Sequence, residues 1–296
     1  MAPIKLAWQS KLVLLAVLPF AAAGVVLQTH WWAVNAAPVA VWAVGLSVLF
    51  SLVVFQLRAA TPGAAFTGAM ITASLIFSTA NFPYRPWQTA LIPVLAVFVL
   101  SFLATRLGRE QKLRLGTAEK REGRNAAQVA ANLGVAALVS DGLVQSWMTN
   151  SGWIALTPPS PMPLFAVGLA ALSEAAADTI SSEVGLVLGG RPRMITTLRP
   201  VDPGTDGGVS LAGTLAGVLA AGIVAAAGSM ALRGGLAMLW VSWAGGVFGL
   251  FFDSLLGATL ERRGWLNNDA VNFLSTASAA GFAVAALVAA SHLRLG

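Results

Sequence analysis

The chain has no cysteine and few charged residues. Among its 296 residues it has only two histidines, His30 and His292, which lie far apart. Disulfides, thiolate metal ligands and a cysteine nucleophile are therefore excluded, and a histidine-based metal site or triad is not expected. Charged residues make up 10% of the chain, against roughly 25% in an average soluble domain. Such a chain cannot cover a water-facing surface.

Apolar sequence instead runs through the whole chain. Hydrophobic residues make up 57% of it, and apolar runs recur from end to end; many are about 20 residues long, the length of a helix that crosses hydrocarbon. The sequence therefore predicts an all-α, polytopic transmembrane helical bundle that forms a single integral membrane domain over residues 1–296. About nine spans are expected, within a range of about seven to nine. Their ranges are Leu12–Leu27, Pro38–Leu57, Gly63–Ala80, Trp87–Ala104, Ala126–Trp147, Pro163–Val184, Val209–Gly228, Gly235–Leu260 and Ala270–Ala290.

Basic residues divide unevenly between the two sets of loops that nine spans create. Fifteen of the 18 Lys and Arg residues fall on one side, and only Arg85, Arg233 and Arg294 fall on the other. Positively charged loops remain in the cytoplasm, so the N-terminus is predicted to be cytoplasmic, in a bacterial-type cell membrane. The net charge of +6 is interpreted as a signal of topology and anionic lipid rather than of nucleic-acid binding.

The first polar cluster enters the predicted fifth span from its basic loop. In the segment REGRNAAQVAANLG, which also contains Arg124, four polar residues recur at the spacing of one helical face. Such a stripe is either an interhelical hydrogen-bonding seam or a donor surface for a phosphate or a base. Its residues are Arg121, Asn125, Gln128 and Asn132.

The second cluster is the segment SEAAADTISSEVG inside the predicted sixth span. Glu174 and Asp178 are four residues apart on one helical face, which Ser182 continues. Two such carboxylates can share a divalent cation, and Mg²⁺ typically takes one or two protein carboxylates together with phosphate oxygens and water. Glu183 falls on another face and joins this site only if the helix ends or bends there. The alternative is a pair of buried acids neutralised by arginine.

The third cluster is the loop RPRMITTLRPVDPGTDGGVS at residues 191–210. Its glycines permit sharp turns and close approach to a ligand, its arginines can bind phosphate with two hydrogen bonds, and Ser210 is a candidate cap for the next helix. The loop does not match a P-loop, so an ordinary connection remains the alternative. The candidate nucleotide-binding residues here are Arg193, Arg199, Gly204, Gly207 and Gly208.

The fourth cluster joins the last two predicted spans. Asp253 lies about 12 Å along the helix axis from Glu261, inside the predicted bilayer. Asp269 and Asn272 follow at the start of the last span, where Asn268 or Asp269 is also a candidate N-cap. All four clusters enter from the predicted cytoplasmic ends of their helices. Acids and arginines at one depth predict a cavity suited to a Mg²⁺–phosphate complex, and apolar surroundings suit a lipid tail.

These segments also resemble a known family in their order and spacing. It is the integral membrane family that includes the plant phytyl-phosphate kinase of the vitamin E pathway and the eukaryotic transmembrane protein 19 group. The resemblance covers roughly residues 100–276 and departs from the expected pattern at ISS, residues 180–182. It rests on EGRNAAQVAANLGVAAL, AAADTISSEVG, PRMITTLRPVDPGTDGGVSLAGTLAG, and FFDSLLGATLE followed by NNDAVNFLST.

The resemblance implies a membrane kinase that converts an isoprenyl monophosphate, such as phytyl phosphate, into the diphosphate. The donor is a nucleoside triphosphate, with CTP preferred. A remoter similarity of the D-x-x-x-S-x-x-G stretch that begins at Asp178 to polyprenol kinases and phosphatidate cytidylyltransferases implies roles for single residues. The implied catalytic residues are Asp178, Asp253 and Arg199, with Arg124 and the 204–208 loop on phosphates. The expected Mg²⁺ ligands are Asp178, Glu174, Glu183 and Asp253.

Three other functions are compatible with parts of this pattern. A CTP-dependent cytidylyltransferase acting on a lipid phosphate would use similar residues. A transporter of an anionic or phosphorylated solute should show polar residues in both membrane halves and commonly an inverted repeat, and neither is visible. A structural scaffold would gain nothing from buried carboxylates, which are costly in hydrocarbon. The expected partners are a nucleoside triphosphate, an isoprenyl phosphate lipid and the bilayer, and homo-oligomerisation stays open.

Overall fold

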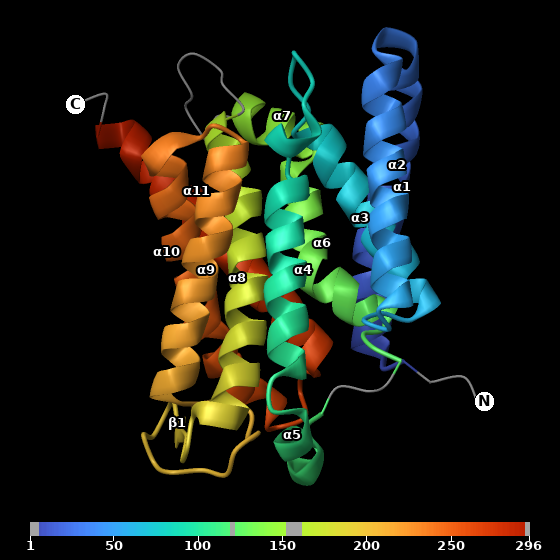
Figure 1. Ribbon diagram of the computed structural model, residues 1–296. Coiled ribbons are helices and arrows are strands. Elements are labelled where there is room, and N and C mark those ends of the chain that lie inside the picture. The colour runs from blue at the N-terminus through green and yellow to red at the C-terminus, as the bar shows by residue number, and fades with distance from the viewer. Residues whose placement is uncertain (1–5, 119–121, 152–161, 294–296) are drawn as a thin grey trace.

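The chain folds into a bundle of long helices (Figure 1). The computed structural model describes residues 6–118, 122–151 and 162–293. Within these ranges the elements are α1 (Trp8–Asn35), α2 (Ala37–Gln56), α3 (Pro62–Ser78), η1 (Pro86–Gln88), α4 (Leu91–Arg106), α5 (Arg109–Leu115), α6 (Ala126–Ser140), α7 (Gly142–Asn150), α8 (Met162–Leu188), β1 (Arg193–Met194), β2 (Gly208–Val209), α9 (Leu211–Ala231), α10 (Gly235–Leu256), η2 (Gly257–Glu261) and α11 (Asn268–Leu293).

Each of the nine predicted ranges contains a helix, which confirms the all-helical membrane architecture. Six helices in the described part of the chain are long and apolar enough to cross a membrane, and the number rises to eight if each of two bent pairs is one span. The third predicted span corresponds to α3, which has only 17 residues. The count of nine and the cytoplasmic N-terminus therefore stay predictions.

The predicted fifth span is not one continuous helix. It is divided into α6 and α7, whose axes differ by 55°. The break lies at Asp141, whose carboxylate accepts a hydrogen bond from the Leu143 backbone nitrogen at 2.9 Å and so caps the start of α7. A second sharp bend, of 67°, separates α4 from α5. There Gly108 has a φ of +59°, a conformation that favours glycine.

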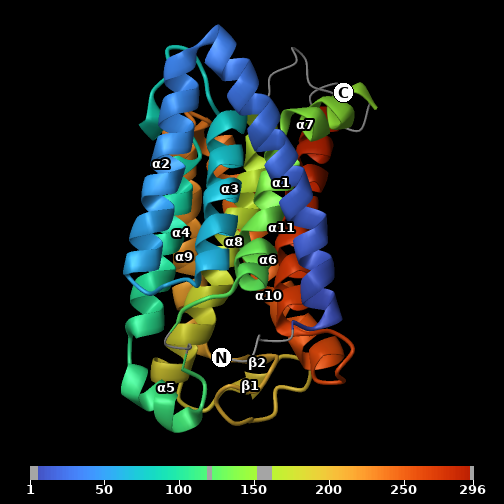
Figure 2. The same ribbon diagram turned by 90° about the vertical axis from the view of Figure 1, so that its right-hand side faces the viewer.

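Helix α8 lies at the centre of the bundle, with α4, α6, α9, α10 and α11 packed around it (Figures 1 and 2). Of its apolar window, 89% is buried, whereas none of the other five long spans exceeds 39%. Small residues make this packing close. A Cβ atom added to Gly217 of α9 would lie only 2.7 Å from the Ala177 carbonyl oxygen of α8. Such contacts between helix backbones are typical of membrane proteins.

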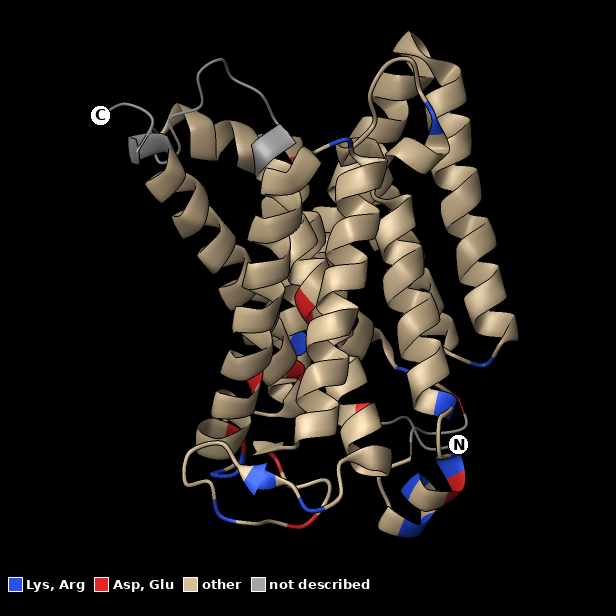
Figure 3. Ribbon diagram, turned by 60° about the vertical axis from the view of Figure 1, so that its left-hand side comes forward, with Lys and Arg blue, Asp and Glu red and all other residues tan. Residues whose placement is uncertain are grey.

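The charged residues gather mainly at one end of the bundle (Figure 3). Contacts between distant segments define this end: Arg106 of α4 donates to the Leu57 carbonyl oxygen at 3.2 Å, and Gln9 of α1 donates to the Trp265 carbonyl oxygen at 2.6 Å. The 191–210 loop lies at the same end and carries the short antiparallel pair β1 and β2 (Figure 2). The predicted clustering of the basic loops is therefore visible in the fold.

Candidate functional site

Three carboxylates from two helices meet inside the bundle. Glu174 and Asp178 lie on α8, and the carboxyl group of Asp253 on α10 lies next to that of Asp178. Ser275 of α11 lies beside both Glu174 and Asp253. We call Glu174, Asp178 and Asp253 the acidic cluster. The structure therefore brings together the acids of the second and fourth sequence clusters.

Glycines on α10 allow the acidic cluster to form. A Cβ atom added to Gly249 would lie 2.4 Å from the Glu174 side chain, and one added to Gly246 would lie 2.7 Å from that of Ser173. Because these positions carry no side chain, α10 packs directly against the face of α8 that bears the acids. The run GGVFGLFFD thus places Asp253 one helical turn beyond its closest contact with α8.

Glu174 is buried, Asp178 and Asp253 are partly buried, and none of the three forms an ion pair among the described residues. Glu174 is 1% exposed. Among the described residues, Glu174 Oε1 and Asp253 Oδ2 have no hydrogen-bond partner. The ion pair in this part of the chain joins Lys112 to Glu183, not to an acid of the cluster. Buried charges without a partner are costly, and ionisable groups inside a membrane bundle typically mark a functional site. The predicted alternative, in which arginine neutralises Glu174 and Asp178, does not describe Glu174, which has no ion pair among the described residues, whereas the charge of Arg124 acts on Asp178.

Hard carboxylate oxygens without partners fit a divalent cation such as Mg²⁺. No group of three or more His, Cys, Asp or Glu side chains in the part of the chain described here is placed to hold a metal ion by itself. Mg²⁺ commonly uses only one or two protein carboxylates and completes its coordination with substrate phosphates and water. Of the predicted ligands, Asp178 and Asp253 are the neighbouring pair that could serve in this way, with Glu174 next to them.

Arg124 reaches the acidic cluster from the start of α6. Its guanidinium donates to the Thr179 hydroxyl at 3.2 Å, and its charge lies close enough to act on the Asp178 carboxylate. Its backbone is held on both sides, because Arg124 N donates to the Ala59 carbonyl oxygen at 3.0 Å and Thr61 N donates to the Arg124 carbonyl oxygen at 2.9 Å. The preceding Gly123 has a φ of +77° and no room for a Cβ against Ala59. Gly123 and the backbone hydrogen bonds of Arg124 therefore fix the point at which the Arg124 side chain enters the bundle.

Two residues of the polar stripe predicted on the fifth span form the N-terminal cap of α6. Asn125 is the N-cap of α6 and forms a capping box with Gln128, whose side chain accepts from the Asn125 backbone nitrogen at 2.7 Å. Asn132 is buried and donates to the Gln128 carbonyl oxygen at 2.8 Å. Asn125 thus precedes the helix instead of continuing a helical face, and Arg121 lies outside the described residues. The structure gives Asn125 and Gln128 a structural task, which the i, i+4 spacing did not reveal.

The carboxylate of Glu183 is engaged outside the acidic cluster. Helix α8 continues unbroken to Leu188, so the bend that would have turned Glu183 toward Asp178 does not occur. Its carboxylate instead forms an ion pair with Lys112 of α5 at 2.5 Å. Ser182, on the same turn, is exposed and donates to the Asp178 carbonyl oxygen at 2.6 Å. The structure gives Glu183 a role in holding α5 against α8.

The 191–210 loop packs against the end of α10. Gly207 has a φ of +74°, and a Cβ atom there would lie 2.4 Å from the Ala258 backbone nitrogen. Ala258 belongs to the π-helical turn η2, which follows Asp253 by about one turn. As predicted, Ser210 caps α9 by accepting from the Gly213 backbone nitrogen at 3.1 Å. The third cluster therefore adjoins the helix that bears Asp253, although not its carboxylate.

The arginines of this loop do not touch the acidic cluster. Arg193 and Arg199 are both exposed, and Arg193 donates to the Leu198 carbonyl oxygen at 2.9 Å. The backbone of Arg199 pairs with Met194 through a bond of 2.9 Å. Gly204 is also exposed and has a φ of +86°, while Gly208 belongs to β2. These residues lie at the charged end of the bundle, on its surface.

Asp269 joins the last helix to the first. Its carboxylate accepts a hydrogen bond from the Ser10 hydroxyl at 2.6 Å, and Asn267 donates to the same hydroxyl at 2.8 Å. Asn267, rather than Asn268 or Asp269, accepts from the Ala270 backbone nitrogen and so caps α11. Asn272 is buried, 9% exposed, and its carbonyl oxygen accepts from Ser275 and Thr276. Ser10 lies in the first 100 residues, where the sequence showed no motif.

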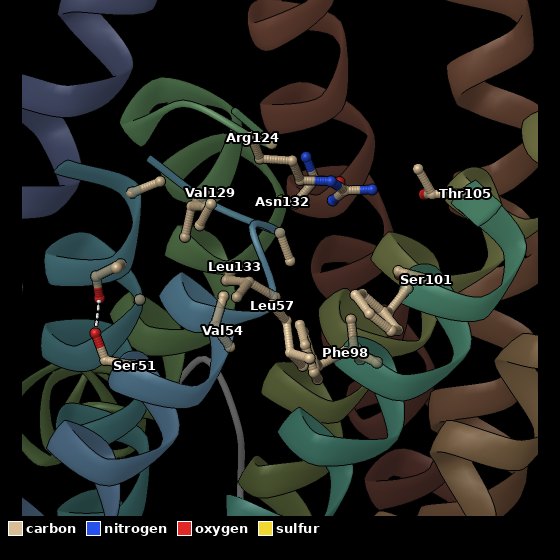
Figure 4. A pocket seen from close by; sticks show the side chains of 18 of the residues that line it. Ser51, Val54, Leu57, Phe98, Ser101, Thr105, Arg124, Val129, Asn132 and Leu133 are labelled. Carbon is tan, nitrogen blue, oxygen red and sulfur yellow. Dashed lines mark hydrogen bonds between the residues drawn. The ribbon is translucent and has the colours of Figure 1, made fainter. Parts of the chain in front are cut away.

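An apolar cavity of about 390 Å³ lies on the other side of α8, between α2, α3, α4 and α6. Ala175 of α8 lines it, and Arg124 extends into it between Asn132 and Thr105 (Figure 4). Its apolar wall includes Val54, Phe98 and Leu133. The segment REGRNAAQVAANLG contributes Gly123, Arg124 and Asn132 to its lining, but the lining residues of α2, α3 and α4 come from generic hydrophobic spans and were not predicted. We call it the α2–α4 cavity.

Comparison with known proteins gives a consistent family match. The protein family described as "Integral membrane protein DUF92" matches residues 45–280. An uncharacterized membrane protein of Methanocaldococcus jannaschii is 43% identical over 108 residues, which cover 36% of this chain and 45% of that protein. An uncharacterized membrane protein of Synechocystis is 34% identical over 210 residues, covering 67% of this chain and 73% of that protein.

Two plant proteins from Arabidopsis thaliana are also similar. The chloroplastic protein VTE6 is 29% identical over 234 residues, covering 77% of this chain and 67% of that protein. The protein PGR is 32% identical over 190 residues, covering 58% of this chain and 64% of that protein. This chain thus spans less than half of the Methanocaldococcus protein and about two thirds of each plant protein. No solved structure matches the chain.

Proposed function

Because the chain belongs to the integral membrane protein family DUF92, we propose that it is a membrane kinase that phosphorylates an isoprenyl monophosphate. The acceptor is a lipid such as phytyl phosphate, the donor is a nucleoside triphosphate with CTP preferred, and the products are the isoprenyl diphosphate and the nucleoside diphosphate. The family resemblance in residues 100–276, which contain the acidic cluster and Arg124, supports this proposal.

The position of Arg124 is the observation that carries the proposal. Its guanidinium lines the apolar α2–α4 cavity, yet it also contacts Thr179 beside Asp178 of the acidic cluster. A lipid phosphate needs an apolar site for its chain and a cation for its head group, and arginine binds phosphate through two parallel hydrogen bonds. Arg124 thus stands where an apolar site and a group of carboxylates meet.

The acidic cluster suits the donor side of such a reaction. Phosphoryl transfer depends mainly on positioning and on neutralising the charge of the transferring group. Asp178 and Asp253 would hold Mg²⁺ together with nucleotide phosphates, and the bound ion would supply charge neutralisation there. Arg193, Arg199 and the glycines of the 204–208 loop lie at the charged end of the bundle, where they would contact the rest of the nucleotide.

The chemistry requires no strong general base in this chain. An oxygen of the acceptor monophosphate, which is already ionised near neutral pH, attacks the γ-phosphorus of the donor. The bond between that phosphorus and the β–γ bridging oxygen breaks, and the nucleoside diphosphate leaves with that oxygen. Arg124 would orient the attacking phosphate. Neither histidine, His30 or His292, belongs to α8 or α10, the helices that bear the acidic cluster, which agrees with a reaction that needs no proton abstraction.

The test is a product assay with purified protein in detergent. Phytyl phosphate, CTP and Mg²⁺ are expected to yield phytyl diphosphate and CDP, with no CDP when the prenyl phosphate is omitted. A polyprenol kinase serves as a positive control for the assay. Release of pyrophosphate with a CDP-linked lipid would instead establish cytidylyl transfer. Absence of turnover with every prenyl phosphate and nucleotide tested would overturn the kinase proposal.

A further inference from the structure

From the geometry of the α2–α4 cavity we infer that it holds the isoprenyl chain of the phosphorylated acceptor and sets the chain length that the enzyme accepts. The chain lies between α2, α3, α4 and α6, with its phosphate at Arg124 and its far end at the aromatic pair of Phe50 and Phe98. The inference rests on the proposed function for the identity of the acceptor. The binding site itself can be tested without turnover.

The cavity has the length and lining that an apolar chain requires. On α4 its lining runs from Arg106 to Val94, which corresponds to about 18 Å along the helix axis. Its volume of about 390 Å³ is in the range typical of small-ligand sites. Polar groups in the walls are largely satisfied within the protein: the Ser51 hydroxyl, for example, donates to the Ala65 carbonyl oxygen at 2.6 Å (Figure 4). The walls therefore offer little to a polar ligand.

Charge distinguishes one end of the cavity from the other. Four arginines line the end near the charged loops, and the described lining contains no aspartate or glutamate. Arg106 is partly engaged, since it lies over the Phe102 ring at 4.0 Å and donates to the Leu57 carbonyl oxygen. Such an end attracts a phosphate rather than a neutral or cationic head group. The four residues are Arg58, Arg106, Arg109 and Arg124.

Ser101 gives a second indication that the cavity accepts a polar group near Arg124. It is 8% exposed, lines the cavity one turn before Thr105, and its hydroxyl has no hydrogen-bond partner among the described residues. Helical serines usually donate to a carbonyl oxygen of the preceding turn, as Ser47 does in α2. The Ser101 hydroxyl is thus left available to a phosphate oxygen at the Arg124 end.

Aromatic rings line the cavity on the approach to its far end, which lies at Val94 on α4. Phe50 of α2 and Phe98 of α4 meet edge to face with ring centroids 5.2 Å apart, and Phe102 stacks on Phe98 at 5.5 Å. These contacts connect two helices that otherwise belong to different packing groups, since α2 packs on α1 and α3, whereas α4 packs mainly on α8 and α9. A chain longer than the cavity must displace this pair, so Phe50 and Phe98 limit its length.

Gly68 offers a way to shorten the cavity without disturbing the fold. It lies on α3 in the cavity lining, and a Cβ atom there would meet only the Val129 side chain, at an ordinary contact distance of 3.9 Å. Gly68→Leu therefore projects a side chain into the deep half of the cavity. Gly45→Leu is the matched control, because Gly45 lies on α2, is exposed, and a Cβ atom added there would meet no atom within 4 Å.

The first experiment maps the binding site in the full-length protein without nucleotide. An isoprenyl phosphate with a photoreactive group at its chain end is cross-linked in detergent micelles, and the labelled peptides are identified by mass spectrometry. Label is expected around Phe50 and Phe98, with competition by phytyl phosphate and much less by phosphatidylglycerol. Label elsewhere, or equal competition by phosphatidylglycerol, would overturn the assignment. Neither labelling nor competition depends on kinase activity. A failure of the proposed function can therefore be distinguished from a failure of this binding site.

The second experiment measures chain-length preference. Gly68→Leu is expected to weaken cross-linking and turnover of phytyl phosphate by about tenfold, the scale of steric discrimination in an apolar pocket, while geranyl phosphate changes less. Gly45→Leu should behave like the parent protein with both substrates. An unchanged preference in Gly68→Leu, or an equal loss for both substrates in a correctly folded variant, would contradict the proposal. Phe98→Ala should shift the preference in the opposite direction, toward longer chains.

Discussion

The guanidinium of Arg124 donates a hydrogen bond of 3.2 Å to the hydroxyl of Thr179, the residue that follows Asp178 on α8. This bond joins the start of α6 to the helix that bears two of the three clustered acids. Ala175 faces the α2–α4 cavity, whereas Asp178 faces Asp253 on α10. Arg124 is thus shared by two compartments that α8 otherwise separates.

The first prediction concerns the shape of the Arg124 side chain. Arg124→Lys keeps the positive charge but loses the planar fork that binds phosphate with two hydrogen bonds. We expect the KM for the prenyl phosphate to rise by about tenfold or more, with a smaller change in the KM for CTP. Steady-state kinetics with each substrate varied in turn would measure this.

The fold should survive this change, because the hydrogen bonds to Ala59 and Thr61 use only the Arg124 backbone. Arg114→Lys is a suitable control, since Arg114 is exposed on α5 and does not line the α2–α4 cavity. Equal effects on both KM values in Arg124→Lys would mean that Arg124 does not hold the acceptor in particular.

The second prediction concerns the acidic cluster. Asp178→Asn and Asp253→Asn each remove one negative charge while keeping the side-chain shape. We expect turnover to fall by about 100-fold or more, because stabilisation of charge in the transition state is lost. Thermal stability in detergent should be unchanged or higher for Asp253→Asn, since one oxygen of this carboxylate has no hydrogen-bond partner. Asp178→Asn should gain less, because the charge of Arg124 acts on Asp178.

Asp202→Asn provides the matched control, because Asp202 is an exposed acid of the 191–210 loop and its carbonyl oxygen, not its side chain, accepts from Thr205. It should retain nearly full turnover. Full turnover in both cluster variants would show that Asp178 and Asp253 do not take part in the reaction.

The helices could be predicted from apolar runs, and the position of the acids of α8 from their spacing within such a run. Apolar runs identified a helix in every expected range, and the spacing of Glu174 and Asp178 correctly placed both on one face of a helix. The depth of Asp253 followed from its distance to the end of its span. The convergence of these acids required the glycines of α10, whose role depends on which helix packs against them.

Contacts between distant segments could not be predicted in this way. In the sequence Lys112 is one of many basic residues that indicate topology, yet it is fully buried and pairs with Glu183. The sequence places Asp269 with the nucleotide-binding residues, yet its carboxylate accepts from Ser10, more than 250 residues earlier in the chain. The α2–α4 cavity likewise depends on how four apolar helices fit together, and their sequences resemble any lipid-facing span.

The third prediction concerns Lys112, which holds α5 in place. Its ammonium group donates to the Ala104 carbonyl oxygen at 2.7 Å, to that of Thr105 at 3.4 Å, and pairs with Glu183. All three of its donors are therefore used, two of them at the carbonyl end of α4, where a cation is favourable. Lys112→Met should destabilise the protein by about 3–5 kcal/mol, since Glu183 loses its partner.

Unfolding in mixed micelles would measure the stability of this variant. The double change Lys112→Met with Glu183→Gln should recover part of the loss, because no unpaired charge remains. Arg114→Met, an exposed position on the same short helix, should have little effect. If the double variant is no more stable than Lys112→Met, the ion pair does not account for the loss.

The last prediction concerns the contact between the 191–210 loop and α10. Gly207 and Gly190 both have positive φ values, +74° and +61°, so alanine at either position carries a conformational cost of about 1–2 kcal/mol. They differ in their surroundings. A Cβ at Gly207 would lie 2.4 Å from the backbone of Ala258, whereas one at Gly190 would meet no atom within 4 Å. Only Gly207→Ala must therefore push the loop away from η2 and the end of the Asp253 helix.

We expect Gly207→Ala to raise the KM for CTP by about tenfold, the effect of misplacing a group that helps to orient a substrate, while Gly190→Ala stays close to the parent protein. Similar kinetics in the two variants would show that the docking of this loop on η2 does not contribute to nucleotide binding, and the arginines of the loop would then report only the topology of the chain.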